Sequence, residues 1–372
     1  MPPLPLPPSS LTGDLWQALL ESQKPIFVYG MGNGADKLFD RLIAMGRPPV
    51  GVFASDGFVR GQSFRSHTVL PLSKVCAHYP DFIALVSFGS RLPEVIESVR
   101  ALANEKELYV PDMPLAGDSY FTADFYREHR EALLTVYDAL ADESSKNLLS
   151  SLILYKLTGR VDMLFDAVCT GDEASLLRLA QTRSAVDVGA YRGDTLLSLL
   201  HDAPLLTHVI AVEPDTRSFR KLSALSATLK GIDVTCVPAA AFSEDGKATF
   251  CASGNRNATL GTALRANTAS YQSKGTCVDT VKIDTLTIGR SVDYVKYDTE
   301  GAEMAALEGS VETIERCHPA LRIALYHRSE DLYEIPLWLM RRFPGKYDLY
   351  LRRTPCFPAW ECDLIAIPTH GI

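Results

Sequence analysis

The stretch "SAVDVGAYRGDTLLSLL", residues 184–200, combines an apolar run, two glycines and the apolar spacing of a helix. The apolar run predicts a buried strand, and the leucines that follow predict a helix. A strand that ends in a glycine-rich turn and leads into a helix N-terminus is typical of a nucleotide-binding site. Gly189 would let a ligand approach the backbone closely, and Gly193 would relieve the turn before Thr195.

Two acidic residues near this turn indicate which nucleotide it holds. Asp187 ends the first predicted strand, where a carboxylate would repel a diphosphate but attract a cationic amino-acid group. Glu213 ends the next predicted strand, where a carboxylate can accept hydrogen bonds from ribose hydroxyls. The glycine spacing also differs from G-x-G-x-x-G. These acids favour S-adenosylmethionine as the cofactor. The alternative is that both acids only cap neighbouring helices.

Strands and helices alternate in two regions of the chain, which predicts two α/β units. We expect a disordered proline-rich arm over 1–20, a small Rossmann-like α/β domain over 21–116, a helical connector over 117–183 and a larger α/β domain over 184–372. Seven strands are predicted in the larger domain, in a mostly parallel, doubly wound sheet with an antiparallel edge. Ligands of such sheets lie beyond the carboxyl ends of the strands.

A polar stretch interrupts the larger domain at residues 253–276. We interpret it as an inserted hairpin and loop, which is a natural place for substrate contacts.

The composition argues against several classes of protein. A hydrophobic share of 47% with 22% charged residues is typical of a globular chain. The net charge of −8 gives no electrostatic reason to bind nucleic acid, and no apolar run approaches the roughly 20 residues that span a bilayer. The eight cysteines form no C-x-x-C pair, so neither a zinc site nor a disulfide scaffold is expected. A cytoplasmic location follows as the default.

Several linked motifs in the larger domain resemble those of the FkbM-type methyltransferase family. They are "VDVGAYRGDTLLSLL" (186–200), "VIAVEPD" (209–215), "YVKYDTEGAEMAALEGSVETI" (294–314), "HPALRIALYHRSEDLYEIP" (318–336) and "YDLYLRR" (347–353). The resemblance implies a class I methyltransferase fold and methyl transfer from S-adenosylmethionine to oxygen, often on a sugar or secondary metabolite.

The resemblance also implies a set of cofactor-binding residues. Tyr191 departs from the family pattern, which commonly has asparagine at this position. The implied set is Asp187, Gly189, Tyr191, Gly193, Asp194, Thr195 and Glu213. The expected partner is a small-molecule or carbohydrate acceptor, with no nucleic acid and no membrane insertion, and a homodimer is left open.

Methyl transfer to an alcohol requires alignment of the reacting atoms and benefits from a positioned base. Asp298 ends the fourth predicted strand, Glu300 follows in the turn, and His327 ends the neighbouring fifth strand. We predict that these three residues orient or deprotonate the acceptor, with a pKa near 6.5 making His327 suitable as the base. A structural His327 is left open, as is Glu303 as a helix-starting acid or a substrate contact. The three residues could also hold a divalent cation, but no metal is predicted.

A second glycine-rich turn, "YGMGNGAD" (29–36), satisfies G-x-G-x-x-G/A through Gly30, Gly32 and Ala35, and Asp56 ends the next strand. This turn supports an alternative function, either a nucleotide- or nucleotide-sugar-binding protein or an NAD(P)-dependent oxidoreductase. Too little α/β pattern follows before the connector to hold a nicotinamide and a substrate. We therefore expect an accessory role for this domain.

Overall fold

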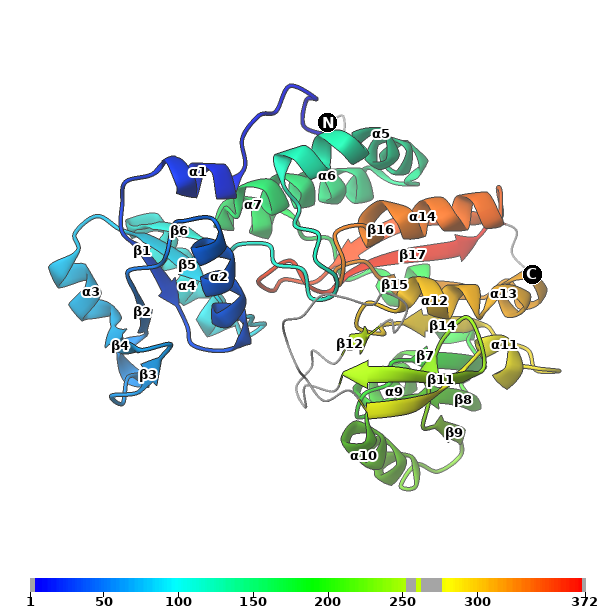
Figure 1. Ribbon diagram of the computed structural model, residues 1–372. Helices are drawn as coiled ribbons and strands as arrows, with labels where there is room; N and C mark the ends of the chain where they lie inside the picture. Colours follow the sequence, from blue (N-terminus) through cyan, green and yellow to red (C-terminus); the bar gives the residue numbers. More distant parts are fainter. Residues whose placement is uncertain (1–3, 252–258, 262–275, 370–372) are drawn as a thin grey trace.

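The computed structural model describes residues 4–251, 259–261 and 276–369, which form two large sheets joined by a helical segment (Figure 1). The N-terminal sheet has the order β3-β4-β2-β1-β5-β6 and is parallel apart from the β3–β4 pair. Its strands are β1 (Ile26–Tyr29), β2 (Gly51–Ala54), β3 (Ser63–Phe64), β4 (His67–Pro71), β5 (Ile83–Val86) and β6 (Glu107–Tyr109). Its helices are α2 (Asn33–Ala44), η1 (Asp56–Phe58), α3 (Leu72–His78) and α4 (Pro93–Glu105).

The expectation of a disordered arm is wrong for residues 4–20. Within this segment α1 (Leu15–Glu21) begins, and the preceding residues are held on the connector. The Tyr126 hydroxyl donates to the Pro7 carbonyl at 2.6 Å, and the Ser150 hydroxyl donates to the Leu4 carbonyl at 2.7 Å. Prolines lack N–H donors but keep their carbonyl acceptors, so a proline-rich chain can satisfy hydroxyls of a helical surface.

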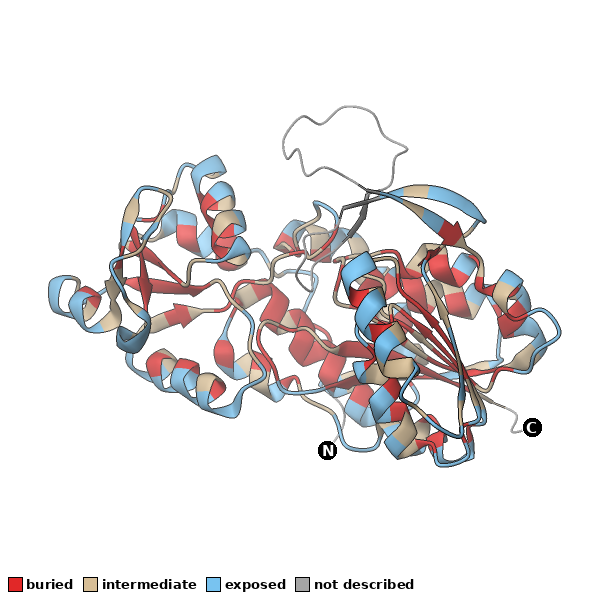
Figure 2. Cartoon of the chain, turned by 90° about the horizontal axis from the view of Figure 1, so that it is seen from below, coloured by how far each residue is buried: buried red, intermediate tan, exposed pale blue. Residues whose placement is uncertain are grey.

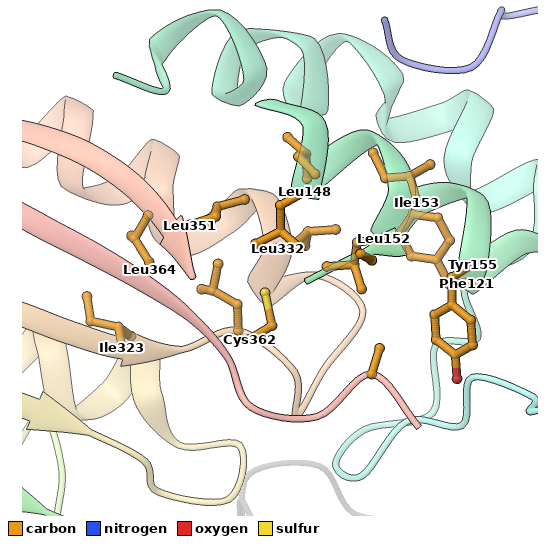
Figure 3. Packing of buried hydrophobic residues seen from close by; sticks show 14 of the residues in the cluster. Phe121, Leu148, Leu152, Ile153, Tyr155, Ile323, Leu332, Leu351, Cys362 and Leu364 are labelled. Carbon is orange, nitrogen blue, oxygen red and sulfur yellow. The ribbon is translucent and has the colours of Figure 1, made fainter. Parts of the chain in front are cut away.

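The connector is part of the core of the C-terminal domain. Its helices are α5 (Ala123–Ala139), α6 (Glu143–Thr158), α7 (Val161–Asp166), α8 (Glu173–Leu176) and η2 (Leu179–Gln181). Helix α6 is buried around most of its circumference, and its Leu148 and Leu152 lie in one buried cluster with Leu332 and Leu351 (Figure 3). The buried Arg353 guanidinium donates to the connector carbonyls of Leu164, at 3.0 Å, and Ala167.

The C-terminal sheet has seven strands in the order β16-β17-β15-β14-β7-β8-β9. They are β7 (Ser184–Val188), β8 (His208–Val212), β9 (Asp233–Val237), β14 (Tyr294–Tyr297), β15 (Ala320–Ala324), β16 (Tyr347–Arg353) and β17 (Cys362–Pro368). All pairs are parallel except those made by β17. The predicted mostly parallel sheet with an antiparallel edge is confirmed.

The central strands of both large sheets are buried, as the red strands of Figure 2 show. The helices of the C-terminal domain are α9 (Asp194–Asp202), α10 (Thr216–Ser226), α11 (Ile283–Leu286), α12 (Glu303–Glu308), α13 (Val311–Cys317) and α14 (Asp331–Arg342). The strand order reverses between β7 and β14. This reversal is the topological switch point at which α/β sheets bind ligands.

The predicted strand over 234–242 is divided between two sheets. Pro238 follows β9, and the chain then enters a small sheet of order β10-β13-β11-β12. Its strands are β10 (Ala240–Ala241), β11 (Gly246–Cys251), β12 (Thr259–Gly261) and β13 (Thr276–Val281). Proline cannot donate a ladder hydrogen bond, which explains the interruption. The expected inserted hairpin and loop over 253–276 falls largely outside the described residues.

Gly189 allows the turn after β7 to pass the end of β14. Its φ is +83°, and a Cβ at this position would lie 1.8 Å from the Asp298 carbonyl oxygen. We expect Gly189→Ala to lower the free energy of unfolding by at least about 2 kcal/mol, from backbone strain and overpacking together. Urea denaturation would measure the loss. Gly246→Ala is the control, because its Cβ would approach no atom closer than Thr280 Oγ1 at 3.7 Å. Equal losses in the two variants would contradict this account of the turn.

Candidate functional site

A cavity of about 920 Å³ opens at the carboxyl ends of β7, β8 and β14. Seven of the ten predicted site residues line it, namely Gly189, Tyr191, Asp194, Thr195, Glu213, Asp298 and Glu300. The other three, Asp187, Gly193 and His327, are not among the lining residues. The volume lies within the range of known small-molecule sites, near its upper end.

Glu213 is held by the backbone on both of its carboxylate oxygens. The Tyr191 N–H donates to Oε2 at 2.8 Å, and the Asp215 N–H donates to Oε1 at 2.7 Å. Burial raises the pKa of Glu213 to about 7 against the effect of these hydrogen bonds. Each oxygen keeps a second lone pair for another donor. Tyr191 has φ +48°, a left-handed conformation that asparagine adopts more readily than tyrosine.

Asp187 lies beneath the cavity wall rather than on it. Its side chain is fully buried, both carboxylate oxygens lack a hydrogen-bond partner, and Oδ1 is 3.8 Å from Lys296 Nζ. Burial raises the pKa of Asp187 to about 6, although Lys296 opposes this rise. Two unpartnered buried carboxylate oxygens favour a cation nearby. The predicted direct contact between Asp187 and a cofactor ammonium group stays a prediction.

Asp298 is an ionised hydrogen-bond acceptor. Lys296 Nζ donates to its Oδ2 at 3.1 Å, and the Tyr326 hydroxyl donates to its Oδ1 at 3.1 Å. Burial alone would raise the pKa of Asp298, but Lys296 and His327 lower it to about 2. A carboxylate with so low a pKa is a weak base at neutral pH, so Asp298 is better suited to accepting a hydrogen bond than to removing a proton.

Glu300 combines an unusual backbone with a strongly shifted pKa. Its φ of +57° is uncommon for a residue with a side chain, and such strain often marks functional sites. Burial raises the pKa of Glu300 to about 8, with His327 opposing and Asp298 adding to the rise. Glu300 also lines the cavity, and a pKa of about 8 suits proton transfer near neutral pH.

The surroundings of His327 favour the structural role left open for it over that of a base. Its side chain is completely buried, with Nδ1 2.9 Å from Glu303 Oε1 and Nε2 3.5 and 3.6 Å from the carboxylates of Glu300 and Asp298. Burial lowers the pKa of His327, but Glu303 and the other two carboxylates outweigh it and raise the pKa to about 10. An imidazole that is protonated at neutral pH has no lone pair with which to accept a proton. His327 is a buried cation that stabilises three carboxylates.

Glu303 organises the turn that carries Glu300. Its Oε1 accepts hydrogen bonds from the Thr299 N–H at 2.6 Å and from the Thr299 hydroxyl at 3.1 Å, and its Oε2 accepts from the Gly301 N–H at 3.1 Å. Burial raises the pKa of Glu303, but His327 and these hydrogen bonds lower it below its ordinary value. Because Glu303 is buried and does not line the cavity, its position does not favour a substrate contact; it is the acid in the first turn of α12, which is the other role left open for it.

Asp298, Glu303 and His327 bring potential metal-ligand atoms within 4.8 Å of one another. In this arrangement two of these residues pair with each other, because His327 Nδ1 lies 2.9 Å from Glu303 Oε1, and the Glu303 oxygens also accept backbone N–H groups. The cluster is an ion-pair network beneath the cavity floor.

The loop after β5 of the N-terminal sheet closes one side of the cavity. Ser90 exchanges two backbone hydrogen bonds with Phe357, at 2.9 and 3.1 Å, and Arg91 forms an ion pair with Glu361. A Cβ on Gly89 would lie 2.2 Å from the Trp360 ring. Gly89, Arg91, Trp360 and Glu361 all line the cavity. The sequence carries no periodicity or motif that signals this contact, because it joins loops more than 260 residues apart.

The second glycine-rich turn is used for packing. A Cβ on Gly34 would lie 2.0 Å from the Ser87 carbonyl oxygen, so this glycine allows α2 to approach the loop after β5. Asp56 Oδ1 accepts the Ser73 N–H at 3.0 Å in the first turn of α3. Neither Gly30, Gly32 nor Asp56 is among the residues that line the 920 Å³ cavity. These contacts favour a structural connection over a dinucleotide site.

The raised pKa values make stability depend on pH. Glu300 is raised from 4.5 to about 8 and His327 from 6.5 to about 10, so the folded state binds more protons than the unfolded state. Their stabilising contributions are complete below the unfolded values and are lost as the pH rises through the folded values. We expect the melting temperature to fall as the pH rises from about 4.5 to about 10. Thermal unfolding across this window would test it, with a flatter curve between about pH 4.5 and 8 for Glu300→Gln. A melting temperature that rises over the same window would be the opposite result.

Comparison with known proteins identifies the C-terminal domain. Residues 187–347 match the family model described as the methyltransferase FkbM domain. Over 97% of this chain and 94% of the other, the structure is similar to a methyltransferase FkbM from Methylobacillus flagellatus KT, with a TM-score of 0.67 at 17% identity.

Other solved structures resemble only about half of the chain. They include an rRNA methylase from Streptococcus thermophilus (TM-score 0.35, 11% identity, 53% of this chain and 94% of that chain) and fibrillarin from Aeropyrum pernix with bound S-adenosyl-L-methionine (TM-score 0.30, 15% identity, 52% of this chain and 73% of that chain). No curated protein matches the sequence. Among the described residues, no helix has the length and hydrophobicity needed to cross a membrane. Residues 187–347 of this chain are therefore similar to the methyltransferase FkbM domain.

Proposed function

We propose that this protein transfers a methyl group from S-adenosylmethionine to a hydroxyl oxygen of a sugar or secondary metabolite. The observation that carries the proposal is one cavity, at the switch point of the sheet, that holds Glu213 at the end of β8 and Glu300 beyond the end of β14. A carboxylate suited to ribose and a carboxylate suited to deprotonation therefore face the same space.

The residues around the β7 turn fit the cofactor. Gly189 lines the cavity where the β7 turn passes close to Asp298, and Glu213 has acceptor capacity left for ribose hydroxyls. Tyr191, Gly193, Asp194 and Thr195 form the turn and the first residues of α9. The unpartnered carboxylate oxygens of Asp187 and the ammonium group of Lys296 would be the charged groups nearest to the amino-acid end of the cofactor. When bound, the cofactor supplies a methyl group activated on a sulfonium.

Glu300 is the proposed general base. Its carboxylate would take the proton of the acceptor hydroxyl as that oxygen attacks the methyl carbon, and the adjoining cavity would hold the oxygen in line. Asp298 keeps its charge through Lys296 and Tyr326 and would orient the acceptor hydroxyl. His327 and Glu303 act indirectly, because they position the turn that carries Glu300.

Titration calorimetry with S-adenosylhomocysteine would test the cofactor site on the full chain. We expect binding, and we expect Glu213→Gln to weaken it by roughly tenfold, since hydrogen bonds to charged groups are the stronger ones. Glu308→Gln, an exposed glutamate of α12 outside the cavity lining, is the control. NADH is titrated in parallel. Binding of NADH with no binding of S-adenosylhomocysteine would overturn the methyltransferase proposal in favour of the N-terminal glycine turn.

We also propose the cytoplasmic location that the cysteine spacing predicts.

A further inference from the structure

Helix α10 presents three cations to the cavity. Arg217, Arg220 and Lys221 are spaced by three and four residues, which places them on one helix face, and all three are exposed and line the cavity. Arg192, in the turn before α9, is also exposed and lines the same cavity, with its guanidinium over the Tyr191 ring at 4.7 Å. We refer to these four residues as the cationic rim.

Within the part of the chain that the structure describes, no carboxylate forms an ion pair with the cationic rim. The two other cations on the cavity wall are paired, Lys296 with Asp298 at 3.1 Å and Arg91 with Glu361. Asp215, beside the rim, accepts the Arg217 and Ser218 N–H groups at the start of α10, where an acid offsets the helix dipole. Like charges three and four residues apart destabilise a helix, so the rim is unfavourable until an anion binds.

The proposed cofactor does not account for the rim. S-adenosylmethionine carries one carboxylate, which its own ammonium and sulfonium groups more than offset in charge. The chain as a whole has a net charge of −8, so four unpaired cations at one cavity run against its general composition. The guanidinium fork matches the oxygens of a phosphate in geometry as well as in charge.

We propose that the acceptor carries a phosphate or diphosphate group, which the cationic rim binds while the acceptor hydroxyl reaches Glu300. This inference rests on the proposed methyl transfer and narrows its substrate to phosphorylated or nucleotide-linked small molecules. A small molecule is favoured over a nucleic acid because the four cations line a single cavity of about 920 Å³. An acidic chain also lacks the extended basic surface on which nucleic-acid binding depends.

Titration of the full chain with inorganic pyrophosphate and with glucose 1-phosphate, each with and without saturating S-adenosylhomocysteine, tests the rim. A variant with Arg217→Gln, Arg220→Gln and Lys221→Gln is expected to bind pyrophosphate at least roughly tenfold more weakly, because several charge-assisted hydrogen bonds are removed. The control is Lys230→Gln, which removes an exposed cation beyond the end of α10 that is not among the cavity-lining residues. Its affinity should stay within about twofold of the unmodified chain, since exposed charges contribute little. The affinity of S-adenosylhomocysteine should be the same in all three proteins.

Each titration tests a different part of the proposal. Absence of pyrophosphate binding, or equal binding by the triple variant, overturns the phosphorylated acceptor whether or not S-adenosylhomocysteine binds. Tighter binding of a single-stranded oligonucleotide than of either small phosphate would overturn it in favour of a nucleic-acid substrate. A failure of S-adenosylhomocysteine to bind would count against the proposed function alone, because the pyrophosphate comparison is also made without it. Stronger binding of glucose 1-phosphate than of pyrophosphate would support a sugar phosphate as the acceptor. The reverse order would support an acceptor that carries a diphosphate.

Discussion

Glu300→Gln is expected to lower the rate of methyl transfer by about 10²- to 10⁴-fold, the usual contribution of a general base. Glutamine keeps the size and hydrogen-bonding shape of the side chain but cannot accept a proton. The affinity for S-adenosylhomocysteine should change little, because Glu213 and the β7 turn would bind the nucleoside at another part of the cavity. Transfer of a radiolabelled methyl group to the acceptor would measure the rate.

The pH profile separates a base from a residue that only positions the acceptor. Since the carboxyl of Glu300 must be ionised to act, the rate should rise with pH and level off above about 8. The rise should disappear in the glutamine variant. Glu308→Gln controls for the loss of one glutamate in the same turn-and-helix region and should retain the full rate. If the Glu300→Gln enzyme kept its activity to within tenfold of normal, Glu300 would not be the general base, and catalysis would depend only on how the enzyme positions the reactants.

His327→Asn is expected to destabilise the protein by about 3–5 kcal/mol, the cost of removing one partner from a buried ion pair. The substitution leaves Glu303 fully buried without its cation and removes positive charge from beside Asp298 and Glu300. Urea denaturation would measure the change in the free energy of unfolding. The variant should also lose activity, because the turn that carries Glu300 is held through Glu303.

Two further variants distinguish charge from packing at His327. His201→Asn, at an exposed histidine of α9, should change stability by less than about 0.5 kcal/mol. A double variant with His327→Asn and Glu303→Gln should be more stable than His327→Asn alone, because the unpaired buried carboxylate is gone. A His327→Asn protein that is as stable as the unmodified chain would mean that the ion-pair network contributes nothing to folding.

Features that depend on local sequence could be predicted. Short apolar runs gave the positions of the seven strands, because strand burial acts over a few residues. The same reasoning placed Glu213 and Glu300 at strand ends, and both line the cavity.

Features that depend on tertiary contacts could not be predicted. The pKa of His327 follows from three carboxylates that the fold brings together, so its ordinary value near 6.5 was a poor guide. Likewise, composition alone made residues 4–20 look disordered, whereas their carbonyls accept hydrogen bonds from distant hydroxyls. The contact of Ser90 with Phe357 joins two loops that carry no shared pattern.

The burial of Arg353 against Leu164 and Ala167 bears on how this chain could be recombined with others. A fragment that begins at residue 184 would keep every strand of the seven-stranded sheet, but the Arg353 guanidinium would lose two of its acceptors and keep only Cys356. Strand β16 would lose its contact with α6, and α14 would lose its contact with α5. Exchange of catalytic domains between relatives should therefore carry the helices of residues 117–183 along with the sheet, and a chimera joined at residue 183 would begin with an incomplete core.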